Sequence, residues 1–318
     1  MARRRALVIG CGGTLGFAWT IAALTAAEEQ LNWDARTAEV LVGTSAGAEV
    51  VSALGSGRSV SDLLAALRAE PGADPLLLNH VHTHPGALPP VPWPGLPGAG
   101  LVAAAVRGRV SPGSGLVGLL PRGRGDAHWL HRFGAALADG RPWPDSTRTW
   151  LVAADARSGR RVAFGAPGAP AADLGSAMAA SWAIPGWFPP VRIGGRTYLD
   201  GGAVSPTSAD LLVPLAVPLR LDEVVIVAPM ATSGGAPTTG LSRFERVLRR
   251  WMTRTVDAEE LRLRAAGCRV VRIEPGAREL AVMGPNFMDL RRRPATLDVS
   301  LRTAPDRVKR AIDRSIPA

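Results

Sequence analysis

Short runs of apolar residues alternate along the chain with longer stretches whose apolar spacing suits helices. The runs predict buried strands, and they lie at residues 6–9, 40–42, 150–155, 223–229 and 269–275. The stretches predict helices at residues 17–31, 59–70, 176–184 and 241–266, with a charged terminal helix from Ala304. Buried strands separated by helices are typical of a mostly parallel sheet covered on both faces. The pattern therefore predicts a three-layer α/β/α fold.

One segment breaks this alternation. Residues 71–121 are dense in Pro and Gly and read as a long loop with apolar residues such as Trp93 and Leu120 interleaved. A lid over an apolar pocket and a surface excursion packed on its own side chains are equally good readings of such a loop. No internal repeat or second-domain linker is evident. We expect a core over residues 5–212, with this lid or insertion at about 71–125, and residues 213–318 completing the same domain.

Composition limits the function classes. The 318 residues, 47% hydrophobic and 20% charged, can bury one large core. The net charge of +10 is carried almost wholly by arginine, with Lys309 the only lysine. GC-rich coding produces the same bias, so the charge alone does not establish a partner. It permits contact with anionic membrane, and the stripe of arginines in 241–266 either lies on lipid or leaves an apolar face to cover the sheet. A basic chain could also bind nucleic acid, but no nucleic-acid-binding motif is present to support such a partner.

Cysteine content and hydropathy bear on location. Cys11 and Cys268 are far apart and form no metal or disulfide pattern. Residues 1–5 are basic, but no apolar core of signal-peptide length follows. No apolar run reaches the roughly 18 to 20 residues that a transmembrane helix needs. We expect a cytoplasmic protein, with peripheral contact to a membrane left open, and the oligomeric state is not determined.

The candidate nucleophile is Ser45. It lies in Gly43-Thr44-Ser45-Ala46-Gly47, after the apolar run 40–42 and before a helix-compatible stretch. Glycines two positions either side let a strand-to-helix turn close sharply, which leaves the serine hydroxyl exposed at the helix N-terminus. The alternative is an ordinary glycine turn with a serine helix cap.

A glycine-rich turn follows the first strand. Residues 10–16 read Gly-Cys-Gly-Gly-Thr-Leu-Gly and precede a helix, so their backbone N–H groups are placed to bind an anion. A dinucleotide needs G-x-G-x-x-G and a later acidic residue, but Leu15 displaces the last glycine and the second strand ends at Ser45. The oxyanion of an acyl-transfer intermediate fits better. A nucleotide-binding oxidoreductase is therefore the third choice.

The histidines do not complete a hydrolase triad. All five precede residue 132, whereas the α/β-hydrolase order is Ser, then Asp or Glu, then His. His80, His82 and His84 alternate in a region read as a solvated loop, and no matching Cys, Asp or Glu spacing makes them a metal site. A carboxylate that takes the serine proton directly would supply the general base that histidine provides in such a triad. Asp155, which ends a strand at a turn, is a weak candidate for it.

These motifs together resemble the patatin-like phospholipase family, including its bacterial members. The glycine turn, the Ser45 turn and Asp200-Gly201-Gly202 carry the resemblance, which covers residues 5–212 well and the rest loosely. The family motif G-G-G-x-R/K-G maps onto residues 11–16, with Cys11 for the first glycine and Leu15 for the basic residue. The resemblance implies a patatin-like fold with the active site at the carboxyl ends of the first two strands.

The resemblance also implies residue roles. Asp200 becomes the base for Ser45, the N–H groups of Gly12 and Gly13 form the oxyanion hole, and neither a cofactor nor a metal is needed. The remaining motif glycines shape the three turns, and they are Gly10, Gly16, Gly43, Gly47, Gly201 and Gly202. The expected activity is hydrolysis of lipid carboxylic esters, of the phospholipid or lysophospholipid class. The alternative is a non-catalytic acyl-binding or regulatory protein that keeps the fold.

Overall fold

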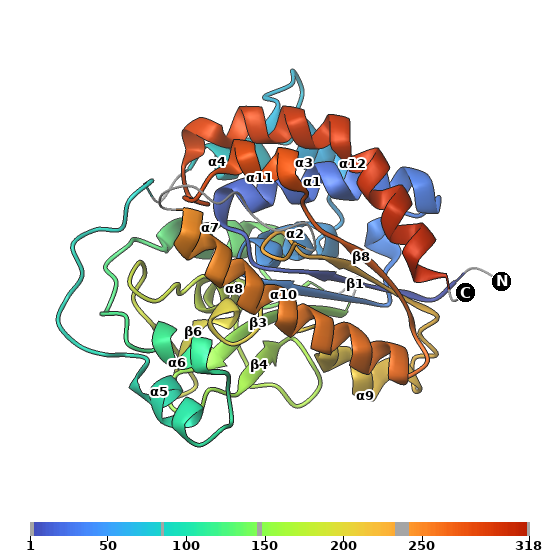
Figure 1. Ribbon diagram of the computed structural model, residues 1–318. Helices are drawn as coiled ribbons and strands as arrows, with labels where there is room; N and C mark the ends of the chain where they lie inside the picture. The colour runs from blue at the N-terminus through green and yellow to red at the C-terminus, as the bar shows by residue number, and fades with distance from the viewer. Residues whose placement is uncertain (1–2, 84–85, 145–147, 233–241, 317–318) are drawn as a thin grey trace.

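The computed structural model describes residues 3–83, 86–144, 148–232 and 242–316, and Figure 1 shows its elements. The strands are β1 (Arg5–Ile9), β2 (Val40–Thr44), β3 (Arg148–Asp155), β4 (Arg161–Phe164), β5 (Val191–Ile193), β6 (Arg196–Asp200), β7 (Glu223–Val227) and β8 (Arg269–Ile273). The α-helices are α1 (Gly13–Leu31), α2 (Ala46–Gly55), α3 (Val60–Leu67), α4 (Pro75–His82), α5 (Ala99–Val106), α6 (Pro112–Val117), α7 (His128–Ala138), α8 (Leu174–Ser181), α9 (Val213–Ala216), α10 (Ser242–Ala265), α11 (Ala277–Met283) and α12 (Arg293–Ser315). Four short 3-10 helices within the described ranges are η1 (Ala35–Thr37), η2 (Gly201–Ala203), η3 (Ala209–Leu212) and η4 (Leu290–Arg292).

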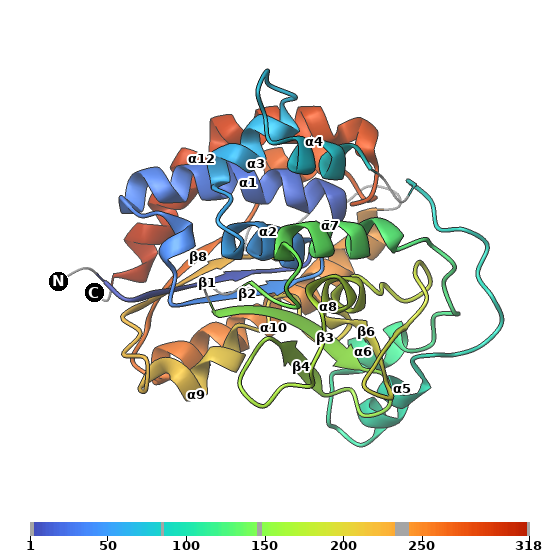
Figure 2. The same cartoon turned by 180° about the vertical axis from the view of Figure 1, so that it is seen from behind.

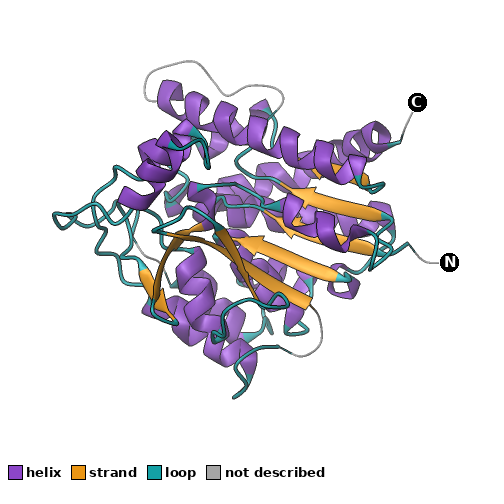
Figure 3. Cartoon of the chain, turned by 90° about the horizontal axis from the view of Figure 1, so that it is seen from below, coloured by secondary structure: helices purple, strands orange, loops and turns teal. Residues whose placement is uncertain are grey.

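The described strands form one sheet of eight, in the order β5-β6-β3-β2-β1-β7-β8, with β4 also paired to β3. The pairs β1–β2, β1–β7, β2–β3 and β7–β8 are parallel, whereas β4 and β6 run antiparallel to β3 and β5 runs antiparallel to β6. Figure 3 shows these strands side by side with helices around them. The predicted mostly parallel sheet is confirmed.

Alternation along the strands divides the core into two layers. Leu7 and Ile9 of β1 pack in the larger cluster, which includes side chains of α1, α2, α7, α8 and α12. Ala6 and Val8 point the opposite way, into a cluster shared with η3, α9 and α10. This follows from the two-residue period of a strand. Figures 1 and 2 show α1, α2 and α12 on one side of the sheet and α9 and α10 on the other, so the three-layer α/β/α prediction is confirmed.

Helix α10 covers one face of the sheet. Val256 and Leu263 are fully buried in the core cluster on that side, so the second half of α10 covers the sheet. Leu248, Trp251 and Met252 of its first half pack near Cys11 and Met230 instead. No helix in the described part of the chain is long and apolar enough to cross a membrane.

The segment 71–121 is more regular than the sequence predicts. It contains the short helices α4, α5 and α6 in place of one long loop. Pro75 and Pro112 stand in the first turns of α4 and α6, behind the N-caps Asp74 and Ser111, whose side chains accept backbone N–H bonds. Proline breaks a helix interior but suits the first turn, where its missing N–H has no partner to lose. Reading each proline as a loop residue was therefore wrong here.

The terminal helix is also longer than predicted. It begins at Arg293, not at Ala304, and contains Pro305. A proline inside a helix removes one backbone hydrogen bond. Here α12 packs along α1, and the Pro305 carbonyl accepts a bond of 2.8 Å from Gln30 Nε2. Tertiary packing therefore carries the helix through a residue that the sequence reads as a boundary.

Candidate active site

Ser45 lies on a strained turn between β2 and α2. Its φ of 56° and ψ of −122° place it outside the regions that non-glycine residues favour, a conformation that costs about 1–3 kcal/mol and is commonest at functional sites. A Cβ on Gly43 would lie 2.5 Å from the Gly47 carbonyl oxygen, and one on Gly47 would lie 2.2 Å from the carbonyl oxygen of Ile9. Gly43 is therefore required for α2 to start this close to β2, and Gly47 for α2 to lie this close to β1.

Replacing Gly47 with alanine tests this close approach. Alanine normally favours a helix over glycine by up to about 1 kcal/mol, but here its methyl group would overlap the β1 backbone. We expect a net loss of stability of about 1–3 kcal/mol, the usual cost of overpacking, measured by urea unfolding. Gly16→Ala is the matched helical control, because its new methyl group meets nothing nearer than Pro229 Cβ at 3.2 Å. An equal or higher stability of Gly47→Ala would contradict the observed geometry.

The turn is anchored by Ser181, a residue that lies in no recognisable sequence motif. The Ser45 backbone N–H donates to Ser181 Oγ at 2.8 Å, and the Ser181 hydroxyl donates to the carbonyl oxygen of Val152 at 2.7 Å. All three groups are buried. Ser181 therefore ties the nucleophile turn to β3. A serine in a helix of small residues carries no sequence signal for such a role.

Strand register brings Asp200 to Ser45. Thr44 pairs with Val152, and Asp200 pairs with Ala153, the next residue of β3. Val152 and Ala153 also pair with β4, so β4 occupies one edge of β3 while β2 and β6 share the other edge end to end. Ser45 follows Thr44 directly. The two candidate catalytic residues therefore meet where β2 and β6 end.

The glycines after Asp200 make room for this meeting. A Cβ on Gly201 would lie 2.6 Å from the Val152 carbonyl oxygen, and one on Gly202 would lie 3.0 Å from Cys11 Sγ. Glycine at these positions lets the backbone approach another loop, as the sequence predicts. The structure shows that approach, both to β3 and to the glycine-rich turn.

The Asp200 carboxyl is poised to exchange a proton near neutral pH. The residue is 4% exposed, and burial raises its pKa to about 7. Two hydrogen bonds act in the opposite direction, one from Ser45 and one from the Gly202 N–H to Asp200 Oδ1 at 2.7 Å. A base with a pKa near the working pH suits general acid–base catalysis.

The glycine-rich turn lies beside Ser45 and Asp200. The N–H of Gly10 donates to the Val227 carbonyl at 2.9 Å, and the N–H of Cys11 donates to the Pro206 carbonyl at 2.8 Å. Helix α1 then begins at Gly13, whose φ is 59°. Neither Gly12 nor Gly13 donates its N–H to another group in the described residues. Both residues line the cavity that holds Ser45.

Leu15 and Cys11, the two residues that depart from the family motif, both lie in apolar surroundings. Leu15 is fully buried against Leu280 and Met283. Burial, and then the nearby Asp200, raise the pKa of the Cys11 thiol well above its ordinary value. A thiol that stays protonated is a poor nucleophile. Cys11 therefore does not compete with Ser45.

Arg249 of α10 places a positive charge behind the glycine-rich turn. The sequence places the arginines of 241–266 on the polar face of their helix, but only 2% of Arg249 is exposed, so that expectation is wrong for this residue. Its Nε donates to Glu245 at 2.7 Å and its Nη1 to the Pro229 carbonyl at 2.8 Å. The Pro229 ring would lie 2.9 Å from a Cβ on Gly12. Arg249 thus fixes the residue that packs against the glycine-rich turn.

Ser45, Asp200, Gly12 and Gly13 line one cavity of about 260 Å³. Most of its other lining side chains are apolar, and they include Val117, Leu120, Ile184, Trp187, Met230, Leu248, Trp251, Met252 and Phe287. An apolar cavity with a few converging polar groups is the usual form of a small-molecule site. Val117 and Leu120 come from the segment 71–125, which therefore contributes a wall to this cavity.

The other described residues that the sequence offers as possible metal ligands or bases have structural roles. His80 does not lie in a solvated loop, as expected; it is buried in α4, with Nε2 2.5 Å from Glu49 Oε2 and its ring stacked on Phe133. His84 lies outside the described residues, and no metal-binding cluster occurs within them. Burial acts to raise the pKa of Asp155, but hydrogen bonds from Ser158 and from the Arg157 N–H, in the turn that follows it, lower the pKa overall. Asp155 is thus a turn-forming carboxylate.

The comparison with protein families bears on these residues. Residues 119–213 match the family model described as patatin-like phospholipase. The resemblance to the patatin-like phospholipases is confirmed. The matched patatin-like region contains Asp200 and both glycines after it, while Ser45 and the glycine-rich turn precede it. The match supports the lipid acyl hydrolase class for this chain.

A search of curated proteins gives no match. Among solved structures, VipD from Legionella pneumophila matches with a TM-score of 0.43 and 13% identity, over 99% of this chain and 67% of the VipD chain.

Proposed function

We propose that this patatin-like protein is a serine acyl hydrolase that cleaves lipid carboxylic esters through a Ser45–Asp200 dyad. One observation carries the proposal. Ser45, on a strained turn, lies where β2 and β6 end beside Asp200, whose pKa burial raises to about 7, and both residues line an apolar cavity. Phospholipid or lysophospholipid is the proposed substrate class.

The proposed reaction has two halves. Asp200 takes the hydroxyl proton of Ser45, and Ser45 Oγ attacks the ester carbonyl carbon. The N–H groups of Gly12 and Gly13 donate to the resulting oxyanion. The tetrahedral intermediate collapses, the alcohol leaves with the proton from Asp200, and an acyl-enzyme remains on Ser45. Water, deprotonated by Asp200, then attacks the acyl carbonyl, which releases the fatty acid and restores the serine.

This proposal predicts an activity that survives removal of metal ions. The proton transfers are assigned to a carboxylate and the oxyanion to backbone N–H groups, so every step is carried by the chain itself. Release of fatty acid from phospholipid in detergent micelles should continue at an unchanged rate with EDTA. Loss of activity with EDTA, restored by added calcium, would contradict the proposed mechanism.

The second candidate is a non-catalytic acyl-binding protein. It is favoured by Cys11 and Leu15, which replace a glycine and a basic residue of the family motif. The same apolar cavity would then hold an acyl chain without cleaving it. Covalent labelling of Ser45, described in the Discussion, separates the two candidates.

A further inference from the structure

A second, larger cavity adjoins the candidate active site. Its volume is about 750 Å³, and it shares Trp251 with the smaller cavity. The backbone after Asp200 also separates the two, since Gly202 and Ala203 line the smaller cavity and Val204 and Ser205 the larger. A molecule with its ester at Ser45 therefore has the larger cavity next to it.

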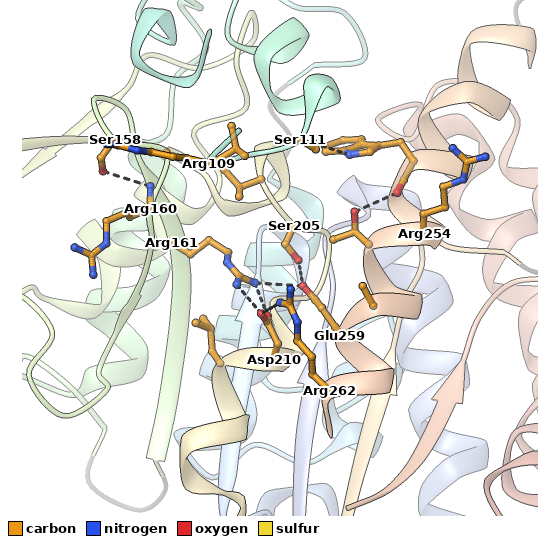
Figure 4. Close-up of a pocket in the computed structure, with 17 residues that line it drawn as sticks. Arg109, Ser111, Ser158, Arg160, Arg161, Ser205, Asp210, Arg254, Glu259 and Arg262 are labelled. Carbon is orange, nitrogen blue, oxygen red and sulfur yellow. Dashed lines mark hydrogen bonds and ion pairs between the residues drawn. The ribbon is translucent and has the colours of Figure 1, made fainter. Parts of the chain in front are cut away.

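Arginines dominate the charged lining of this second cavity. Three separate segments supply them, namely the turn after α5, the β3–β4 connection with the start of β4, and α10. They are Arg109, Arg160, Arg161, Arg254 and Arg262. In Figure 4, Arg161 and Arg262 gather around Asp210, while Arg160 and Arg254 stand on opposite sides. Residues distant in sequence thus surround one space with guanidinium groups.

The carboxylates of the cavity are already engaged. Asp210 accepts from Arg161 at 2.6 and 2.9 Å and from Arg262 at 2.7 Å. Glu259 accepts from the hydroxyls of Ser205 and Thr207 and from the Ala209 N–H. Five arginines against these two carboxylates leave a formal charge of +3. The cavity as a whole is therefore cationic.

Three of the arginines remain available to a ligand. Arg109, Arg160 and Arg254 are exposed, and within the described residues no carboxylate pairs with them. Each guanidinium offers planar N–H donors that match the oxygens of a phosphate group. The volume also falls in the range of about 300–1,000 Å³ that is usual for ligand sites.

We propose that the arginine cavity binds the anionic phosphate headgroup of the lipid whose acyl ester lies at Ser45. This inference rests on the proposed function. Trp251 would separate the two parts of the substrate, since it contributes to both cavities and its indole N–H is held by Ser111 Oγ at 2.8 Å. The substrate class is then an anionic phospholipid, preferred to a zwitterionic one with the same acyl chains.

The first test measures binding without catalysis. Calorimetry on Ser45→Ala would use the chain-free headgroups glycerophosphoglycerol and glycerophosphocholine, and inorganic phosphate. We expect glycerophosphoglycerol to bind most tightly, and the added changes Arg160→Gln and Arg254→Gln to weaken it about tenfold or more. The control pair Arg302→Gln and Arg310→Gln, exposed on α12, removes the same charge and should not weaken it.

The outcomes separate the sources of the phosphate group. Inorganic phosphate that binds as tightly as glycerophosphoglycerol would make this a free-phosphate site and overturn the headgroup assignment. Equal weakening by the control pair would mean general electrostatic attraction, and would overturn it too. Specific headgroup binding in a wild type that hydrolyses no ester would refute the proposed function alone, and would leave the headgroup site supported.

The second test uses specificity. With phosphatidylglycerol and phosphatidylcholine of identical chains, we expect wild-type kcat/KM to favour the former about tenfold or more. The Arg160→Gln, Arg254→Gln double variant should lose most of this ratio, and the control pair should keep it. An unchanged ratio in the double variant would overturn the proposal.

Discussion

Replacing Ser45 with alanine is expected to abolish covalent labelling by a fluorophosphonate probe and to lower ester hydrolysis by about 10³-fold or more, because the acyl-enzyme can no longer form. The probe reacts with serines activated as nucleophiles, so mass analysis of the labelled peptide locates the reactive residue. Ser61→Ala, an exposed serine at the start of α3, is the matched control and should label as the wild type does.

The result also decides between the two candidate functions. Wild-type labelling on a peptide containing Ser45 would support the hydrolase. A folded wild type that does not label, or labels at another serine, would contradict the dyad and favour the acyl-binding protein. Thermal unfolding of Ser45→Ala serves as the check that the loss is chemical, since removal of one hydroxyl should leave the fold intact.

Replacing Asp200 with asparagine is expected to lower kcat/KM on the order of 10³-fold, the usual contribution of a positioned general base. In the wild type, Asp200 must be deprotonated to act, and burial raises its pKa to about 7. Activity should therefore rise with pH, about tenfold per unit below 7, and level off above it. A wild-type profile flat between pH 5 and 8 would contradict the assignment of Asp200 as the base.

As the pH rises towards 7 and above, the stability of the wild type should fall while its activity rises. Because the folded-state pKa of Asp200 lies above its ordinary value of 3.8, the folded protein binds more protons than the unfolded chain between about pH 4 and 7. The Asp200 contribution to stability is therefore lost as the pH rises through this window. Asp200→Asn removes the buried charge and should be the more stable protein at pH 8.

Urea unfolding at pH 5 and pH 8 measures this difference. Asp298→Asn, on an exposed position of α12, is the matched control and should follow the wild type at both values. A variant at Asp200 that is less stable than the wild type at pH 8 would mean that the carboxylate serves folding. A more stable and inactive variant would identify a group held ionisable at a cost to the fold.

Local sequence signals predicted much of the candidate site. The turn at Ser45 was found because its glycines and flanking strand and helix are close in sequence, and the structure shows why a Cβ at Gly43 or Gly47 is excluded. The D-G-G turn at Asp200 was found by resemblance, since such a tripeptide alone is typical of an ordinary turn. Their roles in catalysis stay predictions.

Other site features had no local signal. Ser181 and Arg249 act across elements, and neither sits in a recognisable motif. A helix rich in arginine predicts a surface position for Arg249, whereas packing buries it between Glu245 and Pro229. The arginine cavity likewise has no local sequence signal. Its members come from segments that only the fold brings together.

The sequence by itself determined the alternation of strands and helices, the mostly parallel sheet with three layers, and the two glycine turns, because each depends on the period and chemistry of neighbouring residues. Only the tertiary structure decided that β2 and β6 share one edge of β3, which places Asp200 beside Ser45. It also decided that a helix begins at Pro75 and that another continues through Pro305. Strand register and packing depend on contacts between residues far apart in the chain, and local patterns do not encode these.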